Sequence, residues 1–154
     1  MRDFDPRLVG RLECAAWIAY YRREWLAFLR AAIRLTRHTF GLNWPATLYG
    51  SWLVLRANQL WAPFPDNDPE GAQRCMRSFY RLLVRRHHEH FDVDEAARLE
   101  VEWWRVHRIR QREQPDGDGD PLVDEGCDPG SPLLVDERAA LVRSYAALLS
   151  AVHR

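Results

Sequence analysis

The sequence predicts an all-α protein, a single bundle of about five helices. Apolar residues recur at intervals of three and four along most of the chain, which is the period of an amphipathic helix. Prolines stand where helices are expected to start, as in Asp5-Pro6, Asp68-Pro69 and Ser131-Pro132, with a capping side chain just before them. No segment alternates with a period of two for long enough to predict a strand.

The first helix is predicted to run from Asp5-Pro6 to about His38, with Gly41 as its C-terminal stop. At 100° per residue, one stripe of this single long helix is apolar. The stripe contains Cys14, Trp17, Tyr21, Trp25, Phe28, Ala32 and Leu35.

The second helix is predicted to start at Trp44-Pro45 and to end before Pro63. Because little of its circumference is polar, we expect it to be the most buried helix. Asp68-Pro69 opens a third helix to about His90. Its inward side is predicted to carry Ala72, Cys75, Met76, Phe79, Leu82 and Leu83.

The fourth helix is predicted from the capping box that Asp92 forms with Glu95, and it runs to about Gln111. Its apolar side is expected to carry Ala96, Leu99, Trp103 and Val106.

The predicted organisation is therefore a four-helix core over residues 1–113, a flexible loop over 114–131 and a C-terminal helix over 132–154. The loop is rich in Asp, Gly and Pro. The last helix is expected to dock on the core or on a second copy, because its apolar stripe would otherwise be exposed. That stripe contains Leu134, Leu141, Tyr145, Leu148 and Val152.

Composition narrows the partners and the compartment. The 22 basic residues, all arginine, balance 22 acidic ones, so nucleic acid is not an expected partner. The longest apolar stretch is interrupted by polar residues, and no membrane span is predicted. Three widely spaced cysteines and a charged start without a signal-peptide core predict a reducing, cytoplasmic location.

A possible metal site is the main chemical feature. Helical phase places His87 and His90 inward on the third helix, Glu100 and His107 on the fourth, and Glu24 on the first. Inward carboxylates and imidazoles of a bundle bind iron or another divalent metal. The chain has no Glu-x-x-His motif, however. The other interpretation is structural, with these groups hydrogen-bonded to arginine or tryptophan partners. Within the hairpin of these two helices, His90 and Glu100 are the expected pair, and His107 is the weaker member.

An arginine stripe at Arg23, Arg30, Arg34 and Arg37 is predicted on the first helix. It suits an anion, although a solvated helix face is the favoured interpretation. Glu102, four residues after Arg98 and three before Arg105, predicts an exposed ion-pair ladder. We do not interpret it as catalytic.

Residues 91–108, 55–63 and 65–69 resemble a family of uncharacterised, arginine-rich helical proteins from high-GC actinomycetes. The shared helix carries Trp103-Trp104 followed by His107-Arg108. In that family further helices lie between the Trp-Trp helix and a segment like 125–129, whereas here a stretch rich in Asp and Gly joins them. The resemblance implies a helical fold and no particular activity.

Two functions follow as hypotheses. The first is a non-enzymatic helical protein that acts by protein–protein interaction or self-association. The alternative is a metal-dependent, di-iron-like oxidase or oxygenase with the His/Glu site inside the bundle, so whether the chain is an enzyme stays open.

Overall fold

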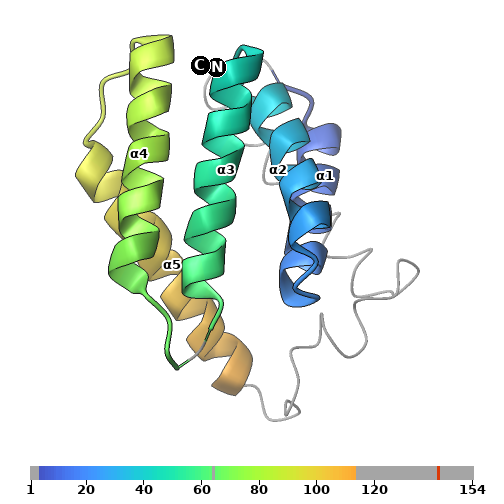
Figure 1. The fold of residues 1–154 in the computed structure, drawn as a ribbon, viewed down its shortest axis with the longest axis vertical. Coiled ribbons are helices and arrows are strands. Elements are labelled where there is room, and N and C mark those ends of the chain that lie inside the picture. Colours follow the sequence, from blue (N-terminus) through green and yellow to red (C-terminus); the bar gives the residue numbers. More distant parts are fainter. Residues whose placement is uncertain (1–3, 64, 114–141, 143–154) are drawn as a thin grey trace. The chain divides into compact units, whose positions relative to one another are not determined.

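The computed structural model describes residues 4–63, 65–113 and 142, and within these ranges it contains five α-helices and no strand (Figure 1). The all-α prediction is confirmed. The helices belong to two compact units, and each is described by itself. One holds α1 (Pro6–Tyr21) and α2 (Trp25–Phe40). The other holds α3 (Trp44–Trp61), α4 (Pro69–His87) and α5 (Val93–Glu113).

The predicted first helix is in fact two helices that pack against each other as a hairpin. Arg23 adopts the left-handed conformation with φ 57°. The amide of Glu24 donates to the carbonyl of Ala19 at 2.9 Å, and the amide of Arg23 donates to the carbonyl of Tyr20 at 3.1 Å. These two bonds are the Schellman motif that ends a helix, usually at a glycine. The prediction of a single long helix was therefore wrong, because the sequence has no glycine at this turn to indicate that the helix ends there.

Aromatic packing accompanies the turn between α1 and α2. The ring of Tyr20 meets that of Trp25 edge-on, with centroids 6.2 Å apart, and Trp25 meets Phe28 at 6.3 Å. Trp17 stacks on Tyr21 from the α1 side at 6.1 Å. Tyr20 and Phe28 are buried. A left-handed arginine costs roughly 1–2 kcal/mol, and ring pairs worth about 0.5–1.5 kcal/mol each offset that cost.

The end of α2 follows the prediction. Gly41 has φ 59°, and its amide donates to the carbonyl of Arg37 at 2.9 Å. The side chain of Arg37 then donates from Nη1 to the carbonyl of Leu42 at 2.9 Å. The left-handed glycine satisfies a terminal carbonyl of the helix, and Arg37 ties the chain just beyond the helix end to its last turn.

Helix α3 packs on α4 and buries small and polar side chains. Ala46, Thr47, Gly50 and Ser51 are buried. A methyl group at Gly50 would lie 3.2 Å from the ring of Phe79, so the two helices approach closely there. As expected, α3 has more buried residues than any other helix among the described residues, although several of its large side chains lie on the surface.

The buried polar groups of α3 are satisfied by their own helix. The hydroxyl of Ser51 donates to the carbonyl of Thr47 at 2.7 Å. The amide of Asn58 donates from Nδ2 to the carbonyl of Val54 at 2.9 Å. Because these bonds stay within α3, neither of these buried side chains is left with an unmet hydrogen bond at the donating group.

Helix α4 starts as predicted and ends early. The Asp68 side chain accepts a hydrogen bond from the amide of Gly71 at 2.7 Å, directly beside Pro69. At the other end His88 is left-handed, with φ 53°, and the helix stops at His87 instead of about His90. The inward side is as expected at four positions, since Ala72, Met76, Phe79 and Leu83 are all buried.

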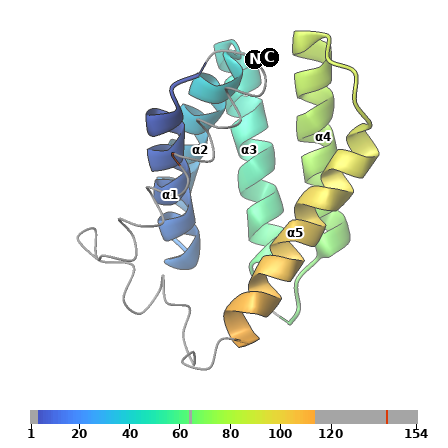
Figure 2. The same cartoon turned by 180° about the vertical axis from the view of Figure 1, so that it is seen from behind.

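Helix α5 runs diagonally across α4 towards the C-terminal end of α3 (Figures 1 and 2). Among the side chains of α5 that the structure describes, Ala97, Val101 and Trp104 are buried. The ring of Trp104 lies 6.1 Å from that of Trp61, at the end of α3. The predicted apolar side was one residue out of phase: Leu99 and Trp103 are each 51% exposed.

The loop predicted over residues 114–131 and the helix predicted over 132–154 lie outside the described residues, apart from residue 142. Of the helices that are described, none is both long enough and apolar enough to cross a membrane.

Candidate functional site

Large apolar side chains lie on the surface along one side of α3. We call the set Trp44, Leu48, Tyr49 and Trp52 the α3 apolar face. Their exposed fractions are 56%, 51%, 50% and 51% respectively. Residues 44, 48 and 52 are spaced by four and therefore follow one another along the helix surface. Surface residues of a helix are normally polar, so this face needs a physical explanation.

The face arises because α3 is apolar around most of its circumference. Its small residues lie on the buried side, where Gly50 approaches Phe79 of α4. Of the large residues, Leu53 and Trp61 are buried as well, and the four of the α3 apolar face lie on the exposed side. There the rings of Tyr49 and Trp52 stack, with centroids 6.3 Å apart and planes 17° apart. Close packing on one side of α3 thus leaves the large side chains on the other.

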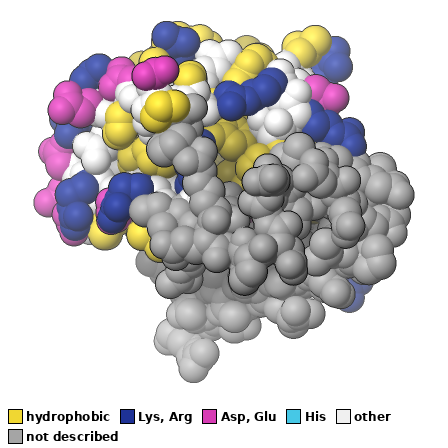
Figure 3. Space-filling view, turned by 90° about the horizontal axis from the view of Figure 1, so that it is seen from below, with side chains coloured by type: hydrophobic (Ala, Val, Ile, Leu, Met, Phe, Trp, Pro, Cys, Tyr) yellow, Lys and Arg dark blue, Asp and Glu magenta, His cyan; other side chains and the backbone are white. Residues whose placement is uncertain are grey.

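The size of the face is notable for a single chain. A fully buried aromatic side chain covers about 150–250 Å², so four half-exposed side chains present on the order of 400 Å². Apolar patches of about 300–600 Å² are the largest on typical monomers and are often functional. Figure 3 shows hydrophobic side chains open on the surface of the described part among arginines and acidic residues, viewed from below.

The face ends at a positive charge. Arg56, one turn beyond Trp52, is exposed and is the one charged residue in the sequence of α3. Its Nη1 donates to Oε1 of Gln59 at 3.3 Å. An exposed apolar strip with a cation at one end suits a partner that offers apolar or aromatic groups and a complement for that cation.

Glu100, one of the predicted metal ligands, has structural partners. Its Oε2 accepts from the Tyr80 hydroxyl at 3.1 Å, and its Oε1 accepts from Nε1 of Trp104 at 3.2 Å. Burial raises the pKa of Tyr80, and the adjacent Glu100 charge raises it further. This tryptophan-bonded carboxylate is what the structural interpretation of the cluster expects.

The other predicted ligands are spread out. His87 is half-buried at the end of α4, and its Nε2 has no hydrogen-bond partner among the described residues. His90 is exposed because α4 ends before it. Glu24 is exposed at the start of α2, in the other compact unit, and the His107 side chain lies outside the described part. The described side chains contain no group of three or more His, Cys, Asp or Glu able to bind a metal. The metal site stays a prediction.

The predicted arginine stripe is interrupted by the break after α1. Arg23 lies in the turn, with its guanidinium 6.0 Å from the centroid of the Trp25 ring. Arg37 binds the carbonyl of Leu42. Arg30 and Arg34 are exposed on α2. One continuous stripe of four is therefore not formed, because Arg23 does not belong to the same helix as the other three. The anion-binding role stays a prediction.

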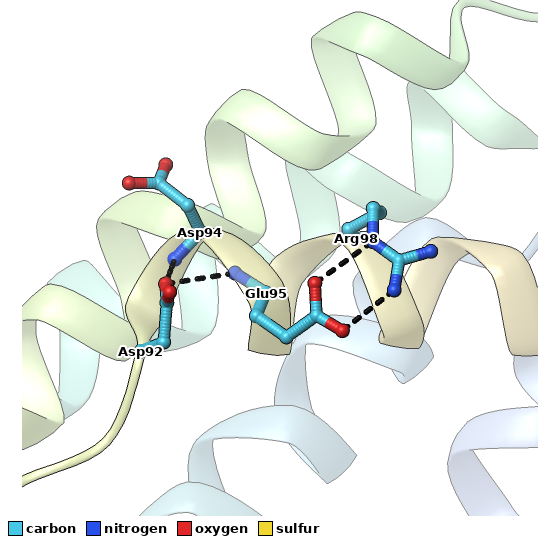
Figure 4. Close-up of polar contacts among 4 residues, drawn as sticks. All are labelled: Asp92, Asp94, Glu95 and Arg98. Atoms are coloured by element: carbon cyan, nitrogen blue, oxygen red, sulfur yellow. Dashed lines mark hydrogen bonds and ion pairs between the residues drawn. The ribbon is translucent and has the colours of Figure 1, made fainter.

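Two ion pairs lie on exposed positions of α5, and Figure 4 shows the one between Glu95 and Arg98. Arg98 pairs with Glu95 and Arg105 with Glu102, each at 2.6 Å. Hydrogen bonds from these arginines lower the pKa of Glu95 and of Glu102. The predicted ladder is confirmed for Glu102 with Arg105, whereas Arg98 turns to Glu95. At the start of α5 the Asp92 carboxylate accepts hydrogen bonds from the amides of residues 94 and 95 at 2.9 and 3.0 Å, as the predicted capping box requires. The Glu95 side chain, which in a capping box would bind the amide of Asp92, binds Arg98 instead.

The α3 apolar face was missed at the sequence level. The signal was present: Thr47, Gly50, Ser51 and Asn58 recur at intervals of three, four and seven on a helix where most of the remaining positions are large and apolar. Small residues at such intervals let two helix backbones approach. They therefore mark the inner side, although hydrophobicity alone would assign it to the large residues.

Comparison of the chain with family models, curated protein sequences and solved structures found no match.

Proposed function

We propose that this protein acts by binding another polypeptide through the α3 apolar face, as an interaction protein whose role requires no catalytic chemistry. One observation supports the proposal: four large apolar side chains, three of them aromatic, are each at least half exposed on one side of one helix. Tryptophan and tyrosine are the residues most enriched at the energetic centres of protein interfaces.

The expected strength follows from the exposed area. Removing on the order of 400 Å² of apolar surface from water contributes roughly 10 kcal/mol at about 25 cal/mol per Å². Loss of translational and rotational freedom on association costs about 4–15 kcal/mol. The partner's own buried area adds to the favourable side. The balance predicts reversible binding of moderate affinity and not a permanent complex.

Site-specific photo-crosslinking in cells that express the full chain tests the proposal. A benzophenone amino acid at Leu48 should give a discrete crosslinked protein adduct after illumination. The same group at Arg81, which is exposed on α4 in the same compact unit, is the matched control and should not give that adduct.

The adduct should disappear when Trp52→Glu is introduced beside the crosslinker, because a buried unpaired charge is costly at an apolar interface. No adduct from Leu48, or an equal adduct from Arg81, would refute a role for this face.

A further inference from the structure

The partner can be specified further, on the premise that the proposed function is correct. We propose that the α3 apolar face binds the same face of a second copy of this chain, with the two α3 helices antiparallel about a two-fold axis that crosses this face level with residue 50, on the side of the helix opposite the contact of Gly50 with Phe79. Such a contact is isologous: if residue i of one copy contacts residue j of the other, then residue j of the first copy contacts residue i of the second. The question is whether the residues of the face complement one another in this register.

The register matches unlike groups that attract. With the axis at residue 50, Leu48 of one copy lies opposite Trp52 of the other, so an aliphatic side chain meets a ring at the centre. Trp44 lies opposite Arg56, six residues on either side of the axis. Every one of these side chains is exposed in the single chain. An indole ring and a guanidinium form a favourable cation–π pair.

This chain already uses the same pairing internally. The guanidinium of Arg108 lies 4.8 Å from the centroid of the Trp61 ring. Arg56 is the one charged residue of α3, and the sequence of that helix contains no acidic residue to pair with it. In the antiparallel dimer each Arg56 pairs with the indole ring of Trp44 of the other copy, and the two-fold symmetry gives two such pairs.

The dimensions are consistent with a reversible dimer. Residues 44 to 56 span about 18 Å of helix at 1.5 Å per residue. Two copies of the face bury on the order of 800 Å² from these side chains. This is below the roughly 1,200 Å² of the smaller stable interfaces, as expected for a weak and reversible dimer. We expect a dissociation constant on the order of 10 µM.

Sedimentation velocity of the purified full chain, from about 1 to 300 µM, measures the association directly. We expect a concentration-dependent shift from monomer to dimer. Leu48→Glu should weaken dimerisation at least tenfold, whereas Arg81→Glu, which makes a charge change on the exposed side of α4, should leave it unchanged. Circular dichroism spectra that match the unaltered chain would show that each variant is folded.

The register has its own test by complementary charges. Trp44→Lys and Arg56→Glu should each weaken dimerisation at least tenfold. An equimolar mixture of the two variants should restore it, because the introduced lysine of one copy then faces the introduced glutamate of the other, while the remaining Trp44 and Arg56 still pair. A variant that only unfolds cannot be rescued by mixing.

The outcomes separate this proposal from the general one. A chain that stays monomeric at 300 µM, or a dimer that persists in Leu48→Glu, would overturn self-association. If the crosslinked adduct from Leu48 nevertheless forms in cells with a different protein, the interaction function stands and only the second copy is wrong. Dimers without rescue in the mixture would overturn the antiparallel register.

Discussion

Tyr80 connects α4 to α5 through a hydroxyl that is absent from phenylalanine, so Tyr80→Phe isolates one hydrogen bond. The hydroxyl donates to Oε2 of Glu100 at 3.1 Å. The ring contacts persist in the variant, since Tyr80 meets Phe91 edge-on with centroids 5.9 Å apart and Phe79 at 5.7 Å. The change therefore removes a polar contact between two helices and leaves the packing in place.

The magnitude follows from the geometry. A hydrogen bond to a charged group contributes about 1.5–3 kcal/mol. At 3.1 Å this bond is longer than the roughly 2.5–2.7 Å of a strong hydroxyl–carboxylate pair. Glu100 is also half-buried and keeps the bond from Trp104. We therefore expect the free energy of unfolding to fall by about 1–1.5 kcal/mol, which corresponds to roughly 3–6 °C for a chain of this size.

The pH dependence gives a second, independent signature. The pKa of Tyr80 is raised in the folded state, first by burial and then by Glu100. A raised folded pKa contributes stability that is present below the unfolded value of about 10 and is lost as the pH rises above it. The unaltered chain should therefore lose stability above pH 10 more steeply than Tyr80→Phe.

Urea denaturation followed by circular dichroism at pH 7 and in the alkaline range measures both effects. Tyr49→Phe is the matched control, because its ring is 50% exposed on α3 and should lose little stability. A loss below about 0.3 kcal/mol at pH 7, or parallel alkaline curves for the two chains, would show that the Tyr80–Glu100 contact does not stabilise the fold as argued.

Two further predictions concern helix ends. Asp92→Ala removes the carboxylate that accepts hydrogen bonds from the amides at positions 94 and 95, and it should lower the free energy of unfolding by about 1 kcal/mol in the same urea assay. Its control is Asp66→Ala, which removes an exposed carboxylate in a loop. Equal losses of stability in the two variants would contradict a capping role of Asp92. Gly41→Ala should cost about 1 kcal/mol because φ is 59°, although nothing lies within 4 Å of the added methyl group. Gly41→Asn should cost less in thermal melts, since asparagine tolerates this conformation, and the reverse order would refute a backbone origin.

The starts of three helices and the end of one could be predicted because each depends on atoms only a few residues apart. Asp5, Asp68 and Asp92 accept amides two or three residues further along the chain. Gly41 ends α2 through its own backbone conformation. Such contacts form whatever the rest of the molecule does, so sequence spacing is sufficient to identify them.

The candidate sites were less predictable because side-chain direction depends on neighbouring helices. His90 was assigned to an inward position on the assumption that α4 continues, but the left-handed His88 ends that helix. Glu100 was predicted to point inward as a possible metal ligand, and it is half-buried. Its partner Tyr80, however, comes from the packing of α4 against α5, and its other partner, Trp104, lies one turn further along α5. The α3 apolar face was missed because hydrophobicity alone does not distinguish the two sides of an apolar helix.

The amino-acid sequence by itself determined that this chain is helical and where most of its helices begin, since periodicity, caps and prolines act within a few residues. The tertiary structure decided where the first predicted helix breaks, because ring contacts around Tyr20 and Trp25 accompany a left-handed arginine that no local signal favours. It also decided which side of α3 is exposed, because close packing of Gly50 against Phe79 admits small side chains and leaves the large ones facing solvent. Local hydrogen bonds select the helices, whereas the volume available between neighbouring helices selects their faces.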